Sequence, residues 1–296
     1  MENASVFACD LDQLKLIEKL CEFNVINKSP KCNCGSLMSF VKSEESIDKY
    51  RLICRFCDRR RSIRSSTWLF KCRLSLERIF KFVSLWSDFI ESSVICKYLK
   101  ISNQTCVNLN KLCYDVVDQA INSCPEPIGG SGCIVEIDES KFGHRKYNVG
   151  HPVEGQWVFG GIDRDSGKVF MVPVDKRDSG TLIPLIIKWM KPESTIISDC
   201  WSAYRKLEEI GYKHLDVNHS VAFKDPFTGA HTNTIESLWR HAKHRIPQYN
   251  RRKSYFSGYL AKFIFIRNAK KSGLDPVAEF FKASKNYKKC VKSRAS

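Results

Sequence analysis

Three acidic residues that lie far apart in the chain are of the type that binds catalytic metal ions. Asp138 ends one short apolar segment, Asp199 follows another, and Glu236 lies in a later segment with helical periodicity. Carboxylates that gather repel one another, so each would rise in pKa unless cations shared the site. Hard oxygen ligands favour Mg²⁺ or Mn²⁺, and two such ions about 3.5 to 4 Å apart can activate an attacking oxygen and stabilise the leaving oxygen of a phosphodiester. Taken singly, each acid could instead be a helix cap or a solvated turn residue.

Other polar residues near these acids are expected to play secondary roles. Glu136 and Glu139 flank Asp138, and we expect both to point to the opposite face of the strand from Asp138. Histidine is more often a core or surface residue than a ligand, but several histidines could line the site: His214, His219, His231, His241 and His244.

Four cysteines near the start of the chain have the spacing of a zinc ribbon. They form two close pairs, Cys32 with Cys34 and Cys54 with Cys57, with 19 residues between the pairs. Two such pairs joined by a hairpin can place four thiolates around one tetrahedral, structural Zn²⁺. Burial of unrelated thiols is the alternative.

Basic residues outnumber acidic ones, and the formal net charge of +16 points to a polyanionic partner. Residues 237–296 hold 16 Lys and Arg against 2 Asp and Glu, whereas residues 132–236 hold 13 against 15. An arginine run after the second cysteine pair either lies along phosphates or forms a solvated loop: Arg55, Arg59, Arg60, Arg61 and Arg64. Further candidates for DNA contacts follow Glu236: Arg240, Lys243, Arg251, Arg252 and Lys253.

Alternating strands and helices must position the three acids. The pattern predicts, in order, strands at 133–138, 157–162 and 168–174, a helix at 181–190, a strand at 195–198, a helix at 201–210, a strand at 214–217 and a helix at 233–244. This order is typical of an α/β, ribonuclease-H-like mixed sheet. Because neighbouring strands lie about 4.8 Å apart, acids at adjacent strand ends can converge with a third acid from a helix.

The segment before this domain has helical periodicity. Residues 74–121 predict helices with a break at residues 101–103, which suits a DNA-binding helix-turn-helix as well as an ordinary helical core. The Pro- and Gly-rich stretch 125–132 predicts a domain boundary. We therefore predict four parts: a zinc-ribbon region at 1–72, a helical region at 73–124, a catalytic domain at 132–270 and a basic C-terminal tail at 271–296.

Composition excludes several classes of protein. Charged residues make up 27% of the chain, and no stretch without Asp, Glu, Lys or Arg exceeds 10 residues, so a membrane-spanning protein is excluded. The first 20 residues lack a basic start followed by an apolar block, so we expect an intracellular protein. Its 14 cysteines then indicate metal binding or burial rather than disulfides.

Several ordered motifs carry a close family resemblance over about residues 30 to 270: CRFCDRRRSIRSSTWLFKCRLSLERI, VEIDESKFGHRKYNVGHPVEGQWVFGGIDR, VPVDKRDSGTLIPLI, ISDCWSAY and VNHSVAFKDPFTGAHTNTIESLW. They resemble the DDE transposases of the Merlin group and their bacterial insertion-sequence relatives. The resemblance implies a DDE triad at Asp138, Asp199 and Glu236, with Asn233 and His219 in supporting roles. The first cysteine pair departs from the pattern Cys-Pro-x-Cys of the relatives.

The mechanism that the resemblance implies is phosphoryl transfer on DNA without a covalent enzyme intermediate. Two Mg²⁺ ions would first activate water to nick the end of the element, and the freed 3′-hydroxyl would then attack target DNA. Two ends must be joined, so a homodimer on DNA is expected, located in the nucleus if the source is eukaryotic and otherwise in the cytoplasm. The alternatives are a nuclease that cuts without joining and a host-retained, transposase-derived DNA-binding protein without strand-transfer activity.

Overall fold

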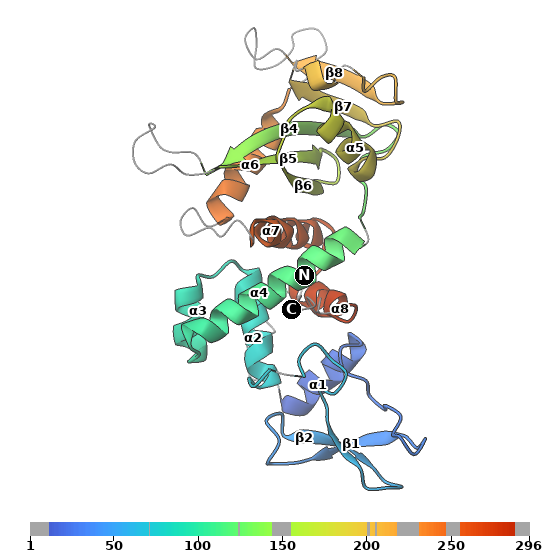
Figure 1. Ribbon diagram of the computed structural model, residues 1–296, viewed down its shortest axis with the longest axis vertical. Coiled ribbons are helices and arrows are strands. Elements are labelled where there is room, and N and C mark those ends of the chain that lie inside the picture. The colour runs from blue at the N-terminus through green and yellow to red at the C-terminus, as the bar shows by residue number, and fades with distance from the viewer. Residues whose placement is uncertain are drawn as a thin grey trace, which may run out of the picture. The chain divides into compact units, whose positions relative to one another are not determined.

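The computed structural model describes residues 12–70, 72–123, 125–143, 155–199, 202–204, 206–217, 231–246 and 255–287 (Figure 1). The chain separates into two compact units. The first combines residues 1–120 with residues 275–296, and the second comprises residues 121–274. None of the described helices combines the length and the apolar character that crossing a membrane requires.

The first unit begins with one helix and a small antiparallel sheet, whose elements are α1 (Gln13–Glu22), β1 (Met38–Lys42), β2 (Tyr50–Cys54) and β3 (Arg60–Ser62). A buried ion pair connects this sheet to the helices that follow it. Nε of Arg64 donates to Asp48 over 2.6 Å, and the same carboxylate accepts from the backbone N–H of Leu76 over 3.0 Å. Arg64 was expected either to lie along phosphates or to belong to a solvated loop; it is only 2% exposed and has this structural role instead.

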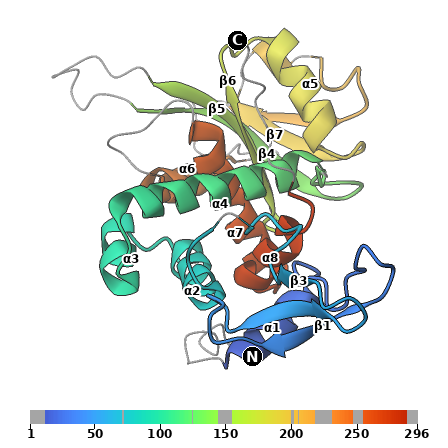
Figure 2. The ribbon, with the colours of Figure 1, turned by 60° about the horizontal axis from the view of Figure 1, so that its bottom comes forward.

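Four helices complete the first unit: α2 (Leu76–Ser87), α3 (Ser92–Leu99), α4 (Asn103–Ser123) and α8 (Pro276–Ser284). Helix α8 comes from the end of the chain and packs beside α2 (Figure 2). Its Phe280 contacts Trp86 with ring centroids 5.7 Å apart, and its Phe281 stacks on Phe80 at 5.2 Å. The prediction of a basic tail at 271–296 is therefore wrong for this helix, because its buried aromatic face belongs to a core.

The second unit is built on a five-stranded mixed sheet in the order β6-β5-β4-β7-β8. Its strands are β4 (Ile134–Phe142), β5 (Gln156–Asp163), β6 (Val169–Val174), β7 (Thr195–Asp199) and β8 (Lys213–Val217). Strands β4, β5 and β6 pair antiparallel, whereas β4, β7 and β8 pair parallel. This order and these directions confirm the predicted ribonuclease-H-like α/β fold.

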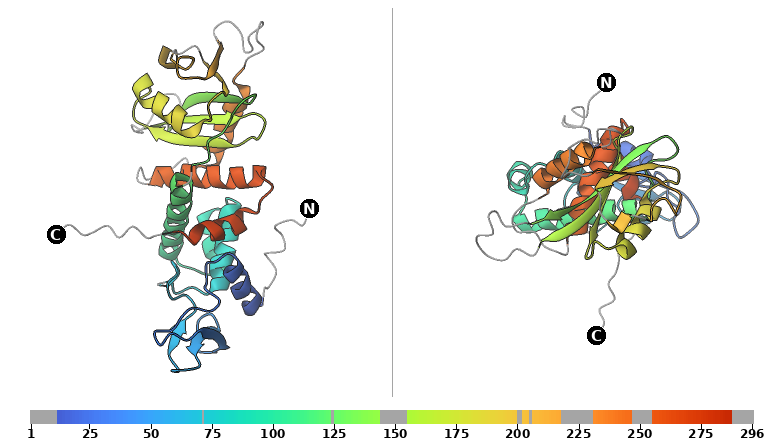
Figure 3. Two further views of the ribbon diagram at one scale, coloured as in Figure 1. Left: turned by 90° about the vertical axis from the view of Figure 1, so that its right-hand side faces the viewer. Right: turned by 90° about the horizontal axis from the view of Figure 1, so that it is seen from above.

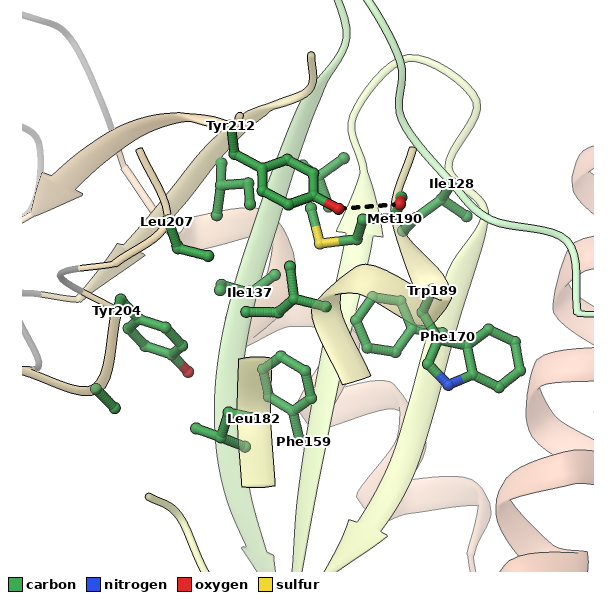
Figure 4. Close-up of a cluster of buried hydrophobic side chains, with 14 of the residues drawn as sticks. Ile128, Ile137, Phe159, Phe170, Leu182, Trp189, Met190, Tyr204, Leu207 and Tyr212 are labelled. Atoms are coloured by element: carbon green, nitrogen blue, oxygen red, sulfur yellow. Dashed lines mark hydrogen bonds between the residues drawn. The ribbon is translucent and has the colours of Figure 1, made fainter. Parts of the chain in front are cut away.

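Helices cover both faces of this sheet (Figure 3). One face packs on α5 (Ser179–Trp189) through a core in which Phe159 and Phe170 meet Leu182 and Trp189 (Figure 4). The other face carries α6 (Asn233–Arg245). Helix α7 (Phe256–Lys271) lies along the edge strand β6, where the side-chain amide of Asn268 both donates to and accepts from the backbone of Val169.

The segment predicted as a helix at 201–210 differs in the structure. Its described part contains a short 3₁₀ helix, Ser202–Tyr204, followed by successive turns. Tyr204 and Leu207 are both fully buried, so two buried residues three positions apart are placed here by turns rather than by the predicted helix. Gly211 then adopts φ +93°, a left-handed conformation that directs the chain into β8.

Candidate active site and cysteine cluster

Asp138 and Asp199 occupy matching positions on two neighbouring strands. The parallel register of β4 and β7 pairs Glu136 with Ile197, and each acid lies two residues further along its strand. Residues two apart on a strand share a face, so both acids point to the face opposite the α5 core. Because adjacent strands are about 4.8 Å apart, the strand register itself brings these two carboxylates together.

Helix α6 covers the face to which the two acids point. The indole N–H of Trp239 donates to Oδ2 of Asp138 over 2.8 Å, and the backbone N–H of Ile235 donates to Oε2 of Glu136 over the same distance. Glu236 follows Ile235 in the first turn of α6 and is exposed. The structure therefore brings Glu236 to the same side of the sheet as Asp138 and Asp199.

Gly160 makes room for the contact between Trp239 and Asp138. It pairs with Asp138 across β4 and β5, and a Cβ atom there would lie 2.6 Å from Cη2 of Trp239. Only glycine lets the indole ring lie against the strand at this distance. Phe142 then meets the same ring edge-on, with centroids 6.0 Å apart.

Glu136 anchors the start of α6, which the sequence analysis missed. Its carboxylate is fully buried and accepts from Nε of Arg164 over 2.6 Å as well as from Ile235. Arg164 also donates to the backbone oxygen of His231 over 2.7 Å, just before α6 begins. The prediction that Glu136 points away from Asp138 is wrong, because both side chains contact α6.

Glu139 points to the opposite face, as predicted, and accepts a hydrogen bond from the hydroxyl of Tyr204. Burial is the main cause that raises the pKa of Glu139 to about 8, with Asp138 and Asp199 adding to the shift and Arg177 opposing it. The guanidinium of Arg177 lies 3.8 Å from the ring centre of Trp157, which places a cation on this side of the sheet.

Burial and neighbouring carboxylates both shift the pKa of Asp138. Burial raises the pKa of Asp138 to about 6, the Trp239 hydrogen bond opposes the rise, and the charges of Asp199 and Glu236 add to it. Lys243 of α6 is the basic residue whose pKa responds to Asp138: burial lowers that pKa, and Asp138 partly restores it. Its ammonium also lies 5.6 Å from the ring centre of Phe142.

The donor chemistry of the three carboxylates fits hard divalent cations. All three offer oxygen ligands, and like charges in a half-buried site are stabilised when cations neutralise them.

The four predicted cysteines do form a closed group. The sulfur atoms of Cys32, Cys34, Cys54 and Cys57 all lie within 4.8 Å of one another. Two pairs, Cys32 with Cys57 and Cys34 with Cys54, are 3.5 Å apart. Zinc-bound sulfurs lie about 2.3 Å from the ion, and a tetrahedron of that size has edges near 3.8 Å, so the group could hold Zn²⁺.

Local turns aim these sulfur atoms at one another. In the first knuckle, the backbone N–H of Cys32 donates to the oxygen of Ser36, and Gly35 turns the chain with φ +89°. A hydrogen bond from the backbone of Ser36 lowers the pKa of the Cys34 thiol to about 6. The lowered pKa favours the thiolate, the form in which cysteine binds metals.

The predicted DNA-contacting residues belong to both compact units of the chain. Arg59 and Arg60 are exposed, and Arg60 pairs with Asp58 over 3.3 Å. Arg61 donates to the side chain of Asn33. Arg240 is exposed on α6. Four predicted residues lie outside the described part of the chain: His219, Arg251, Arg252 and Lys253.

The residues that the sequence analysis missed left partial signals. Strict alternation along β4 places Glu136 on the face of Asp138, and two consecutive glycines within β5 indicate a close approach by another segment. Arg164, in contrast, follows β5 at a turn where an arginine ordinarily faces solvent, so its buried partner is visible only in three dimensions.

Comparisons with known proteins identify relatives of this domain. Residues 129–268 match the ISXO2-like transposase domain. A Haemophilus influenzae protein described as an uncharacterized transposase-like protein is 33% identical over 94 residues, which make up 31% of this chain and 75% of that protein.

Solved structures with similar coordinates include two viral integrase catalytic cores. The catalytic core of BIV integrase has a TM-score of 0.32 and 13% sequence identity, and the match covers 46% of this chain and 84% of the integrase chain. The catalytic core of HTLV-2 integrase, in complex with magnesium, has a TM-score of 0.31 and 15% sequence identity, and the match covers 47% of this chain and 88% of the integrase chain.

Proposed function

The chain belongs to the family of DDE transposases with an ISXO2-like domain, and from this premise we propose that it cuts DNA at the ends of a mobile element and joins those ends to target DNA. The motifs quoted above favour the Merlin group within this chemistry. The observation that carries the proposal is the meeting of Asp138 and Asp199 on adjacent parallel strands beneath the helix that bears Glu236.

In this proposal Asp138, Asp199 and Glu236 hold two Mg²⁺ or Mn²⁺ ions. When bound, these ions supply activation of the attacking oxygen and stabilisation of the leaving oxygen at a phosphodiester. The residues of the chain have separate tasks. Trp239 fixes the orientation of the Asp138 carboxylate, while the buried Glu136 holds the first turn of α6, and therefore Glu236, against β4.

Basic side chains beside the acids would bind the DNA backbone. Lys243 lies close enough to Asp138 for that carboxylate to raise the pKa of the lysine, and Arg240 is exposed on the same helix. Cations placed beside a carboxylate site can contact the phosphates that flank the scissile bond. Catalysis of this kind depends on positioning and charge neutralisation, which are the properties this arrangement provides.

The cysteine cluster is proposed as a structural Zn²⁺ site that holds the N-terminal sheet together. Partners would be the element's terminal repeats, target DNA and a second copy of this chain, because joining two ends requires two active sites. A nuclear location is proposed for a eukaryotic source and a cytoplasmic one otherwise.

The test uses the purified full chain and linear DNA that carries candidate terminal repeats. We expect cleavage with Mg²⁺ and none with EDTA, and we expect pre-cut ends with a free 3′-hydroxyl to join a supercoiled plasmid. Cleavage without joining would identify a nuclease, and binding without either reaction would favour the transposase-derived DNA-binding protein. Either result would contradict the proposal.

A further inference from the structure

Helix α4 presents a row of exposed, mostly polar side chains along its N-terminal half. Its opposite face is buried through Cys106, Leu109 and Cys113. The exposed row follows helical spacing and consists of Asn103, Gln104, Val107, Asn108 and Lys111. Amide side chains are short and uncharged, and they can both donate and accept hydrogen bonds. These properties suit contacts with the edges of bases.

The turn between α3 and α4 has the short length that is typical of a helix-turn-helix. Helix α3 ends at Leu99, Lys100 adopts a left-handed conformation with φ 49° and ψ 51°, and α4 begins at Asn103. Oγ of Ser102 accepts from the backbone N–H of Thr105 over 3.2 Å, which caps α4. In this motif the N-terminal half of the second helix enters the major groove, and that half of α4 bears the amide row.

Contacts between the two helices fix the direction of that row. Nδ2 of Asn110 donates to Oγ of Ser92 over 3.1 Å, and the thiol of Cys106 donates to the backbone oxygen of the same serine over 3.8 Å. The start of α3 is thereby tied to the second turn of α4. The exposed side chains are presented on a rigid pair of helices rather than on a loop.

Gln104 and Asn108 act as one unit. Nε2 of Gln104 donates to Oδ1 of Asn108 over 3.0 Å, one helical turn apart. The bond leaves a donor, Nδ2 of Asn108, beside an acceptor, Oε1 of Gln104. In the major groove adenine presents the complement, an N7 acceptor beside an N6 donor.

The charge of the surrounding surface complements DNA. Residues 92–114 contain three lysines and no Asp or Glu, and the exposed acids Glu91 and Asp115 bound this stretch. All three lysines, Lys97, Lys100 and Lys111, are exposed. Lysines that flank a polar row can bind the phosphates on either side of a groove, while the row faces the bases.

We infer that the Gln104–Asn108 pair binds the major-groove edge of an adenine and thereby sets the sequence preference of this protein for duplex DNA. Val107 lies on the same face, is 42% exposed and contacts the methyl group of a thymine. The inference rests on the proposed function only in taking duplex DNA as the partner.

The test separates base reading from charge. Duplexes are selected from a randomised library by the full chain in EDTA, and affinities are then measured for the best duplex and for copies in which single adenines are replaced by 7-deazaadenine, which lacks N7. For the wild type, one replacement should weaken binding roughly 5-fold or more. Asn108→Ala should lose about the same factor on the natural duplex and nothing further on the modified one.

Lys111→Gln is the matched control on the same helix face. It should weaken binding to every duplex alike and reduce the slope of log affinity against log salt by about 1. Both positions are exposed, so helix α4 keeps its core, and alanine is a good helix former.

Two results would overturn the inference: a wild-type protein with no sequence preference, or an Asn108→Ala variant that selects the same duplexes as the wild type. Equal losses by Asn108→Ala on natural and modified duplexes would overturn it as well. A chain that selects adenine-containing duplexes through Asn108, yet neither cuts nor joins DNA with Mg²⁺, would support the inference while contradicting the proposed function.

Discussion

The cysteine cluster and the three carboxylates bring their ligand atoms together in different ways. The cysteines lie between residues 32 and 57, and short turns of a single small sheet place all four sulfurs within 4.8 Å of one another. The acids come from two parallel strands and a helix between residues 138 and 236. The cysteine cluster is assembled by a short local segment, whereas the carboxylates are brought together by the fold of a whole unit.

This difference matches two kinds of metal chemistry. Structural zinc sites are closed tetrahedra whose binding energy supports the fold, whereas catalytic sites keep positions open for substrate. The surroundings agree with this division. The acids are held by Trp239, Glu136 and Arg164, which orient carboxylates and attach α6, and the cysteines are held by backbone turns. Substitution of a cysteine of the cluster should lower the stability of the fold, whereas substitution of one of the three acids should lower the rate of DNA cleavage.

The largest effect is expected for Asp199→Asn. The substitution removes the charge of one proposed metal ligand but keeps the shape of the side chain at the end of β7. Cleavage should fall roughly 10³-fold or more, while DNA binding and thermal unfolding stay near wild type. The measurement is a cleavage time course with Mg²⁺ beside a binding titration in EDTA.

The control for this substitution is Asp165→Asn, which neutralises an exposed carboxylate in the turn between β5 and β6. Its cleavage rate should equal that of the wild type. Near-normal cleavage by Asp199→Asn would remove Asp199 from the catalytic group, and equal losses in both variants would show an effect of net charge alone.

The converse result is expected for Cys54→Ser, which alters a fully buried member of the cysteine cluster. Loss of a structural metal costs at least about 4 kcal/mol, so the first unit should unfold at lower denaturant concentration. Metal analysis should show one Zn²⁺ per wild-type chain and none in the variant. Cys21→Ser, at a half-buried cysteine of α1 outside the cluster, should keep its zinc. A wild-type chain without zinc would refute the structural assignment.

A third substitution, Glu136→Gln, tests whether the carboxylate site depends on the fold. Removing one charge from a buried ion pair costs about 3 kcal/mol, because the partner Arg164 keeps its charge. The second unit should unfold at lower urea concentration, and cleavage should fall because the start of α6 loosens. Glu126→Gln breaks an exposed pair with Lys168 and should cost about 0.5 kcal/mol or less. Equal stability of the two variants would argue against an anchoring role for Glu136.

The sequence reveals the carboxylates more readily than their supports. Asp138 and Asp199 could be found because the ends of neighbouring parallel strands meet at one edge, so a one-dimensional pattern has a three-dimensional consequence. Glu136 was assigned to the wrong face although alternation along the strand places it beside Asp138. Its role as an anchor depends on Arg164 and on the first turn of α6, and no local pattern links these segments.

Helix α8 shows the same limit. The lysines around it predict a basic tail, and the apolar residues among them carry no sign of where they pack. Phe280 and Phe281 meet Trp86 and Phe80 of α2, which lie almost two hundred positions earlier in the chain. A basic charge pattern predicts solvent exposure only for a segment without a buried face. The buried face of α8 becomes visible only when its partner, α2, is known.

The smallest expected effect comes from Trp239→Phe, which keeps an aromatic ring over Gly160 and removes only the N–H that donates to Asp138. Groups that orient a metal ligand are worth about 10- to 100-fold in metal affinity or activity, so the Mg²⁺ concentration for half-maximal cleavage should rise by about 10-fold. Trp189→Phe is the control, because the indole nitrogen of Trp189 is buried and has no hydrogen-bond partner among the described residues. That variant should lose some packing energy and keep the wild-type Mg²⁺ requirement. If Trp239→Phe also keeps the wild-type Mg²⁺ requirement, the indole only fills space, and the strands alone orient the carboxylates.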